Sequence, residues 1–106
     1  MSVMLVATME VDPARVPEFL ELHRERKLQT IRMGANDHRV FALSAAGAEV
    51  GRWVGVIEFD SNEALGSFMD AQGTDPEAQA SIAKATGPEG PARVLSLFVA
   101  QEVTAT

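Results

Sequence analysis

The segment Arg52–Phe59 predicts a β-strand that is apolar on both of its faces. Trp53 and Ile57 point to one face, while Val54 and Val56 point to the other. A strand in a small antiparallel sheet usually alternates apolar with polar residues, because one of its faces meets water. The pattern therefore indicates a strand whose second face also needs a cover.

The same periodicity predicts three further strands and two helices. The predicted strands are Val3–Val11, Arg39–Ala45, Arg52–Phe59 and Val94–Val103. The first helix begins at Asp12 and Pro13, as N-cap and first residue, runs to about Met33 and ends at Gly34. A turn over residues 46–49 joins the second and third strands.

The second helix is predicted to be interrupted. Asp60 or Ser61 is predicted to cap its start. Glu63, three residues after Asp60, makes this pattern similar to a capping box. The helix breaks near residues 73–74, and the Asp-Pro pair at 75–76 starts it again for a second half that ends at Thr86.

The order of elements is βαββαβ, the plan of a ferredoxin-like α+β domain. Right-handed crossovers place the four antiparallel strands in the order 4-1-3-2, with both helices on one face. A register that pairs Glu10 with Arg52 makes both faces of the sheet mostly apolar. Its further pairs are Met4 with Glu58, Val6 with Val56 and Thr8 with Val54, and, on the opposite face, Val3 with Phe59, Leu5 with Ile57, Ala7 with Gly55 and Met9 with Trp53.

Helices can cover only one of these two faces. We therefore expect a second copy of the sheet to pack against the face that carries Val6, Thr8, Val54 and Val56, because an uncovered apolar sheet associates or aggregates. The alternative is a different register and an apolar face that needs no partner. The first interpretation makes the protein a homodimer through its sheet.

The composition fits one domain over residues 1–106 and disfavours several classes of function. The formal net charge of −6 argues against binding to nucleic acid or to anionic membrane surfaces, since phosphate binding needs surplus Lys and Arg. Cysteine is absent, which excludes disulfides, thiolate nucleophiles and zinc–thiolate sites. Neither a signal peptide nor an apolar run of membrane-spanning length is present, so we expect a cytoplasmic protein.

Three stretches of the chain resemble the dimeric α/β-barrel superfamily, which includes antibiotic-biosynthesis monooxygenase-type and NIPSNAP-type domains. They are VDPARVPEFLEL at 11–22, IEFDSNEALGSFMDA at 57–71 and TDPEAQASIAKA at 74–85. The resemblance implies a homodimer in which two sheets face each other, with a pocket between sheet and helices in each protomer. Relatives include cofactor-free oxygenases of aromatic polyketides, haem-degrading enzymes, isomerases and cyclases.

The resemblance to the haem-degrading relatives is partial. They typically carry Asn on the first strand, Trp just before the second helix and His in that helix's second half. At the matching places this chain has Thr8 or Met9, Phe59 and Glu77. Only the aromatic character of Phe59 and the cap at Ser61 agree, which argues against haem degradation. The residues for polyketide oxygenation vary more among relatives, so that activity stays open.

His23 is the candidate catalytic residue. On a helical wheel of residues 14–33 it lies near the centre of the predicted sheet-facing side, with Lys27 and Thr30 alongside. The apolar residues of that side are Val16, Phe19, Leu20 and Ile31. A histidine in a cleft there can act as a general base on a phenol or an activated C–H group, because its ordinary pKa is near neutrality. The alternative is a structural histidine bonded to a backbone carbonyl at the cleft rim.

The predicted opposite wall of the pocket comes from the sheet. Ala7 and Gly55 are small and leave volume, Met9 lies beside them, and Trp53 can stack on a flat ligand. Phe59 occupies the position where the haem-degrading relatives have Trp, and we predict that it also contacts the ligand. These residues, with Thr30 and with Lys27 as a charged side chain at the sheet edge, make up the predicted ligand-binding set.

The other polar residues are expected to be structural. His38 follows Asn36 and Asp37 in a predicted turn, and Glu10 with Arg52 fits a cross-strand pair. A solvated helix surface is expected for Glu21, Arg24, Glu25, Arg26 and Arg32. Neither metal-ligand spacing nor a glycine-rich phosphate loop is present, so we expect no metal and no nucleotide cofactor.

Two hypotheses of function follow. The first is a small cofactor-independent oxygenase, cyclase or isomerase that acts on an aromatic or polyketide-like molecule, with His23 as the base. The second is a non-catalytic homodimeric module that binds an apolar small ligand or has a structural role. Whether His23 faces an enclosed cavity or fills a tight core discriminates between them, whereas the substrate cannot be named from the sequence.

Overall fold

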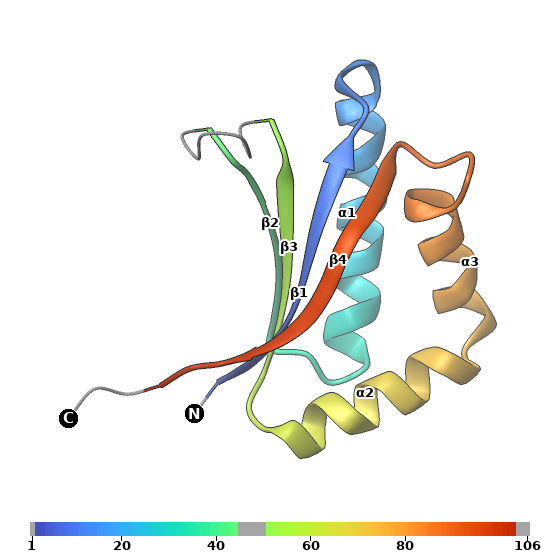
Figure 1. Ribbon diagram of the computed structural model, residues 1–106. Helices are drawn as coiled ribbons and strands as arrows, with labels where there is room; N and C mark the ends of the chain where they lie inside the picture. Colours follow the sequence, from blue (N-terminus) through green and yellow to red (C-terminus); the bar gives the residue numbers. More distant parts are fainter. Residues whose placement is uncertain (1, 45–50, 104–106) are drawn as a thin grey trace.

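The computed structural model describes residues 2–44 and 51–103 (Figure 1). The strands are β1 (Val3–Val11), β2 (Asp37–Ala42), β3 (Trp53–Phe59) and β4 (Ala92–Gln101). The helices are α1 (Val16–Arg32), α2 (Asn62–Thr74) and α3 (Pro76–Thr86), and a short 3-10 turn covers Pro13–Arg15. The predicted turn over 46–49, and the end of the second predicted strand at Ala45, lie outside the described residues.

The four strands form one antiparallel sheet in the order β2-β3-β1-β4, and all three helices lie on one side of it (Figure 1). This confirms the predicted ferredoxin-like α+β plan and strand order. The predicted register of β1 against β3 is also confirmed, from Val3 opposite Phe59 to Met9 opposite Trp53. β4 pairs with the other edge of β1, and the register of this pairing shifts between Thr8 and Met9.

The first helix is divided at its start, where a single helix was predicted. The Asp12 side chain accepts a hydrogen bond from the Ala14 backbone N–H at 3.0 Å, and this cap begins the 3-10 turn rather than α1. The regular helix begins at Val16, with Pro17 in its first turn, where proline is tolerated. It ends as predicted before Gly34, whose φ of 109° favours a residue without a Cβ.

The predicted break in the second helix is confirmed as two helices at a marked angle (Figure 1). Ser61 caps α2 by accepting a hydrogen bond from the Ala64 N–H at 3.1 Å. Asp75 ends α2 and caps α3, because its side chain accepts from the Glu77 N–H at 2.9 Å. α2 crosses the foot of the sheet, and α3 packs against α1.

β2 begins at Asp37, two residues before the predicted start at Arg39, because pairing with β3 starts as soon as the chain leaves α1. The Asn36 N–H donates to the Glu58 carbonyl at 2.7 Å, and Asp37 lies opposite Glu58. This places His38 inside a strand rather than in the predicted turn, with its side chain on the helix-covered face opposite Ile57.

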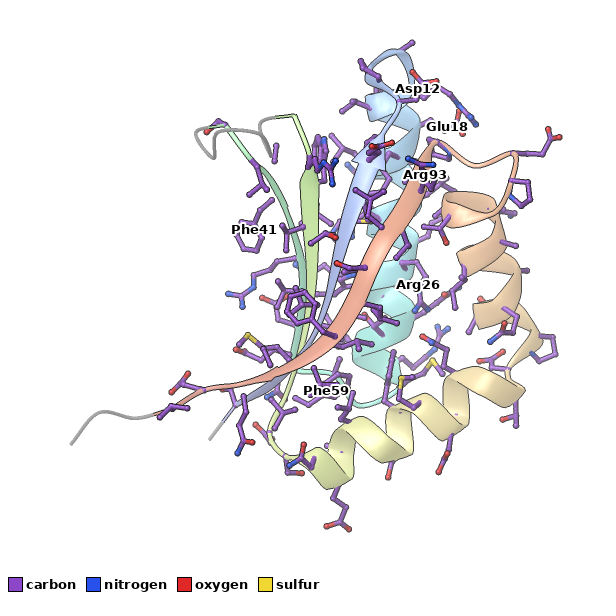
Figure 2. The ribbon with its side chains drawn as sticks, in the orientation of Figure 1. Asp12, Glu18, Arg26, Phe41, Phe59 and Arg93 are labelled. Carbon is purple, nitrogen blue, oxygen red and sulfur yellow. The ribbon has the colours of Figure 1, made fainter. Side chains whose placement is uncertain are left out.

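The hydrophobic core between sheet and helices consists of two separate clusters. Near α2, Phe59 (Figure 2) is fully buried. Phe68 is fully buried too, and the centroids of the two rings are 5.0 Å apart. The other buried members of this cluster are Val3, Leu5, Ala35, Ile57 and Leu65. The second cluster, towards the start of α1, contains Met9, Val11, Phe19 and Ala92. The layer between the clusters contains the candidate site.

Candidate functional site

A cavity of about 220 Å³ lies between the sheet and the helices. Its lining comes from all four strands and all three helices: Leu5, Ala7, Met9, Phe19, His23, Arg26, His38, Val40, Gly55, Ile57, Met69, Gln72, Ile82, Ala85, Thr86, Val94 and Leu97. Val94, Leu97 and Met69 are substantially exposed, so the cavity opens to solvent between β4 and α2. The lining is mostly apolar, as in sites for small organic ligands.

The cavity exists because two small residues meet in the middle of the sheet. Ala7 on β1 lies directly opposite Gly55 on β3, and both line the cavity. The neighbouring pairs contain the larger side chains of Leu5 and Met9, which belong to the two separate core clusters. The small side chains at these two positions leave space that the fixed backbone cannot close, and the end of the Met9 side chain over Gly55 fills only part of it.

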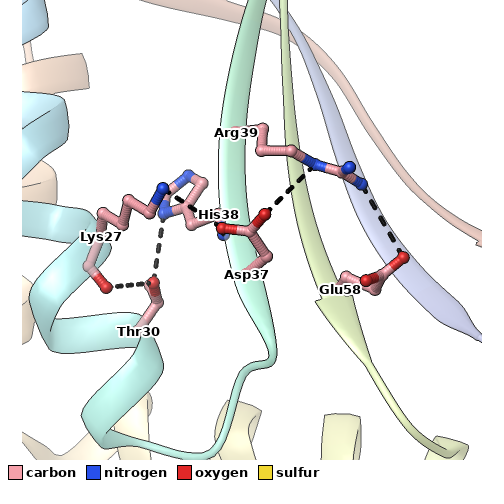
Figure 3. Close-up of polar contacts among 6 residues, drawn as sticks. All are labelled: Lys27, Thr30, Asp37, His38, Arg39 and Glu58. Atoms are coloured by element: carbon pink, nitrogen blue, oxygen red, sulfur yellow. Dashed lines mark hydrogen bonds and ion pairs between the residues drawn. The ribbon is translucent and has the colours of Figure 1, made fainter.

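His23 and His38 form the polar part of the wall at α1 and β2. Their ring centroids are 4.7 Å apart and their planes meet at 87°, an edge-to-face contact. His38 Nδ1 lies 3.3 Å from Thr30 Oγ1, and the Thr30 hydroxyl donates to the Lys27 carbonyl at 3.0 Å (Figure 3). Since that hydroxyl has only one proton, Thr30 accepts from His38 Nδ1–H, which leaves the lone pair of His38 on Nε2.

Both rings are held neutral at ordinary pH. Burial lowers the pKa of His38 to about 3; the positive charges of Arg26 and Lys27, and any proton on His23, act in the same direction, whereas the negative charge of Asp37 acts in the opposite one. Burial also lowers the pKa of His23, followed by the charge of Lys27. No hydrogen bond to the His23 ring comes from residues 2–44 or 51–103, so this neutral ring has a free lone pair for a ligand proton.

Arg26 corrects an expectation, because it is buried instead of solvated. Only 8% of Arg26 is exposed, and its guanidinium donates to Gln29 Oε1 at 3.2 Å and to Gln72 Oε1 at 2.6 Å (Figure 2). Gln29 in turn donates to Ser81 Oγ on α3 at 2.8 Å. These polar side chains join α1 to both other helices.

The buried side of α1 is therefore rotated from the predicted one. Leu20 and Ile31 were expected to face the sheet, but each is 42% exposed. The fully buried positions of the helix are Phe19, Arg26, Gln29 and Thr30. The wheel centred on apolar residues was wrong because α1 packs against α3 as well as the sheet, and hydrogen-bonded polar side chains fill that second contact.

Four predicted site residues line the cavity, namely His23, Ala7, Met9 and Gly55. The ring of His23 lies between helix and sheet, as the sequence predicted, in contact with His38 rather than with Trp53. His38, Arg26, Gln72 and Thr86 are the polar lining residues that sequence reasoning missed as site candidates. The sequence did carry a signal for His38, because it lies two residues before Val40 and therefore on the same face of the strand.

The other four predicted site residues lie outside the lining. Trp53 packs edge-on against Phe19, with ring centroids 5.5 Å apart, and so supports the wall from behind. Thr30 and Phe59 are fully buried in the protein interior. Lys27 points away to an ion pair with Asp37, at 3.3 Å between Nζ and Oδ1 (Figure 3).

Two rows of charged residues border the opposite, helix-free face of the sheet. At one end Arg39 lies 3.6 Å from an oxygen of Asp37 and 3.8 Å from one of Glu58 (Figure 3). At the other end Glu10 pairs with Arg93 at 2.7 Å and with Arg52 at 4.0 Å, which confirms the predicted cross-strand pair. The face between these rows carries Val6, Val54 and Val56, together with the exposed side chains of Phe41 and Phe98.

The described part of the chain gives no indication of a metal site or a membrane span. In residues 2–44 and 51–103, no three His, Asp or Glu side chains are grouped as metal ligands. Within the same ranges, no helix has the length and apolar character that crossing a bilayer requires.

The fold and the cavity define a ferredoxin-like α+β domain with an apolar site between sheet and helices. This is the fold of antibiotic biosynthesis monooxygenase-type and NIPSNAP-type proteins, so the predicted resemblance is confirmed at the level of fold. No protein-family model and no curated protein sequence matches the chain.

Three solved structures illustrate the likeness. SnoaB, a cofactor-independent oxygenase from Streptomyces nogalater, has a TM-score of 0.70 at 13% identity, over 98% of this chain and 95% of that one. An uncharacterized NIPSNAP domain protein from Burkholderia xenovorans has a TM-score of 0.68 at 19% identity, over 99% and 95%. A Bordetella bronchiseptica protein provisionally assigned as an antibiotic biosynthesis monooxygenase has a TM-score of 0.67 at 15% identity, over 97% and 98%.

Proposed function

We propose that the protein is a small cofactor-independent enzyme that removes a proton from an aromatic or polyketide-like molecule, with His23 as the general base. The observation that carries this proposal is the apolar cavity with the neutral ring of His23 in its wall, to which no side chain or backbone group of residues 2–44 and 51–103 forms a hydrogen bond. The fold shared with the oxygenase SnoaB supports it. The cavity is smaller than the roughly 300–1,000 Å³ typical of drug-sized ligands, which favours a substrate of about two fused rings.

Proton removal is the step that the three candidate reactions share. His23 takes the proton, and the electron pair of the broken C–H or O–H bond stays on the substrate as a carbanion, enolate or phenolate. In an isomerase the proton returns to another carbon, and in a cyclase the carbanion adds to a carbonyl of the same molecule. In an oxygenase the carbanion reduces O2, and the net change of CH2 plus O2 to C=O plus H2O needs no other reductant.

The proposal includes a homodimer that forms through the helix-free face of the sheet. The apolar residues Val6, Val54 and Val56 lie in the centre of this face, with Phe41 and Phe98 on the outer strands, each 47% exposed. Charged residues border the face at both ends of the strands. An apolar centre with a polar rim is the usual anatomy of a protein–protein interface.

The test of the base uses 2-tetralone, a two-ring ketone whose CH2 group between ring and carbonyl is acidic. Deuterium exchange at this carbon in D2O, followed by NMR, measures proton removal whichever reaction comes later. We expect His23→Phe, which keeps an aromatic ring but removes the base, to lower the protein-catalysed exchange rate by about 10²–10⁴-fold. Oxygen uptake measured in parallel identifies an oxygenase.

Two results contradict this function. Unchanged exchange in His23→Phe removes the base assignment, whereas binding of 2-tetralone without any catalysed exchange in the wild type favours the non-catalytic ligand-binding module. Leu28→Phe is the matched control, because Leu28 lies on the same helix with 67% of it exposed and does not line the cavity.

A further inference from the structure

Arg26 is a buried, positively charged residue in the wall of a mostly apolar cavity (Figure 2). Arg26 lies three residues after His23 on α1, so the two side chains share one face of the helix about one turn apart. Arg26 lines the same cavity as His23 and His38, and so belongs to its polar wall.

The partners of Arg26 are neutral amides. Its two hydrogen bonds go to the side-chain oxygens of Gln29 and Gln72, and no carboxylate among residues 2–44 and 51–103 forms an ion pair with it. A guanidinium has five N–H donors. Two bonds to amides leave donors for a further acceptor and leave the charge without a counter-ion in the described part of the chain.

Such an arrangement is costly unless something else uses the charge. A buried ion without a partner of opposite sign lowers stability, and an arginine does not relieve this by losing its proton, because it stays charged in proteins. Burial does lower the pKa of Arg26, in the direction expected for a charge without compensation. A purely structural link between α1 and α2 would be made as well by an apolar side chain of similar length.

We propose that Arg26 binds a negatively charged oxygen of the ligand. Two sources share this chemistry: a permanent carboxylate on a small apolar acid, and the enolate or phenolate oxygen that forms when His23 removes a proton. In the second case the proton moves to the His23 ring and the electron pair moves onto the carbonyl oxygen beside Arg26, so the step needs no other reactant. The inference rests on the proposed use of the cavity as a ligand site.

The test compares two probes of nearly the same shape, 2-naphthoate and the neutral 2-naphthamide, by isothermal titration calorimetry. We expect the wild-type protein to bind the carboxylate at least about tenfold more tightly than the amide, the usual effect of a charge-assisted hydrogen bond in a buried site. Arg26→Met keeps the length of the side chain without its charge and should abolish this preference.

Arg24→Met is the matched control, because Arg24 lies on the same helix but is mostly exposed and paired with Glu21. It should leave the preference for naphthoate unchanged. A third probe, 2-naphthol, separates the two sources of the anion, because its absorption moves to longer wavelength on ionisation. Ionised naphthol in the wild type but not in Arg26→Met indicates that the site stabilises an oxyanion formed within it.

The result for the wild type alone can overturn the proposal, whether or not Arg26→Met folds. Binding of naphthamide with no preference for naphthoate refutes anion binding by Arg26 while the cavity stays a ligand site. Equal preference for naphthoate in a folded Arg26→Met also refutes it. Binding of none of the three probes contradicts both this inference and the proposed function.

Discussion

Acidification from pH 7 to pH 5 is predicted to destabilise the protein through His38. The buried ring has a pKa of about 3, compared with an ordinary value of 6.5. Below pH 6.5 the unfolded chain therefore binds a proton at this ring that the folded chain does not bind. The stability that comes from the neutral ring is complete above about pH 6.5 and is lost progressively as the pH falls towards 3.

The magnitude follows from the two pKa values. At pH 5 the unfolded ring is almost fully protonated and the folded ring is neutral, so the free energy of unfolding is about 2 kcal/mol lower than at pH 7. His23 adds to the loss, because burial lowers its pKa too. Asp37 changes the result little between these pH values, because hydrogen bonding from the His38 N–H lowers the pKa of that carboxyl and it stays ionised at pH 5; at lower pH its protonation adds to the loss of stability.

Urea unfolding followed by the fluorescence of Trp53, the only tryptophan, measures this effect at pH 7 and pH 5 and at one protein concentration. His38→Phe keeps the ring contact with His23 but cannot titrate, and we expect its loss of stability between the two pH values to be about 2 kcal/mol smaller than that of the wild type. A wild-type pH dependence that survives unchanged in His38→Phe refutes the argument. His23→Phe is the comparison variant, and we expect it to remove a smaller part of the pH dependence of stability than His38→Phe does.

Two further predictions concern assembly and the core. Val56→Asp places a charge in the centre of the helix-free sheet face and should shift the protein towards monomer in light scattering, whereas the same mass for both proteins at every concentration contradicts the proposed interface. Phe68→Ala removes a fully buried ring packed on Phe59 and should lower the free energy of unfolding by about 3–5 kcal/mol in urea denaturation; a loss below about 1 kcal/mol contradicts the assigned core.

The sheet could be predicted from the sequence because its signals are local and periodic. Alternation within Val3–Val11 and Trp53–Phe59 indicated which side chains share a face, and the pairing of Glu10 with Arg52 then determined the register. Side-chain caps marked the helix starts in the same way, as Ser61 and Asp75 show. These features depend on neighbours in the chain or in one adjacent strand, and hardly on tertiary packing.

The site was predicted only in part, because helix periodicity does not show which polar residues are buried. The wheel of α1 correctly placed His23 near the sheet, but it assigned Leu20 to the interior and Arg26 to solvent. Both errors come from the packing of α1 against the other two helices, which the local pattern does not encode. Partners such as Gln72, 46 residues away from Arg26, can be identified only once the helices are placed.

The cavity and the polar side of α1 have one structural cause. Ala7 and Gly55 divide the core into two clusters, and a continuous core would be more stable, since missing side chains in the interior lose both apolar burial and packing contacts. The helix that covers this gap presents His23 and Arg26 to it, where apolar side chains would fill the space and avoid burying a charge. Small residues on the sheet side and polar residues on the helix side both lower stability at the same layer. Departures from good packing that coincide in this way are typical of a functional site, and they are what distinguishes this layer from the well-packed clusters on either side.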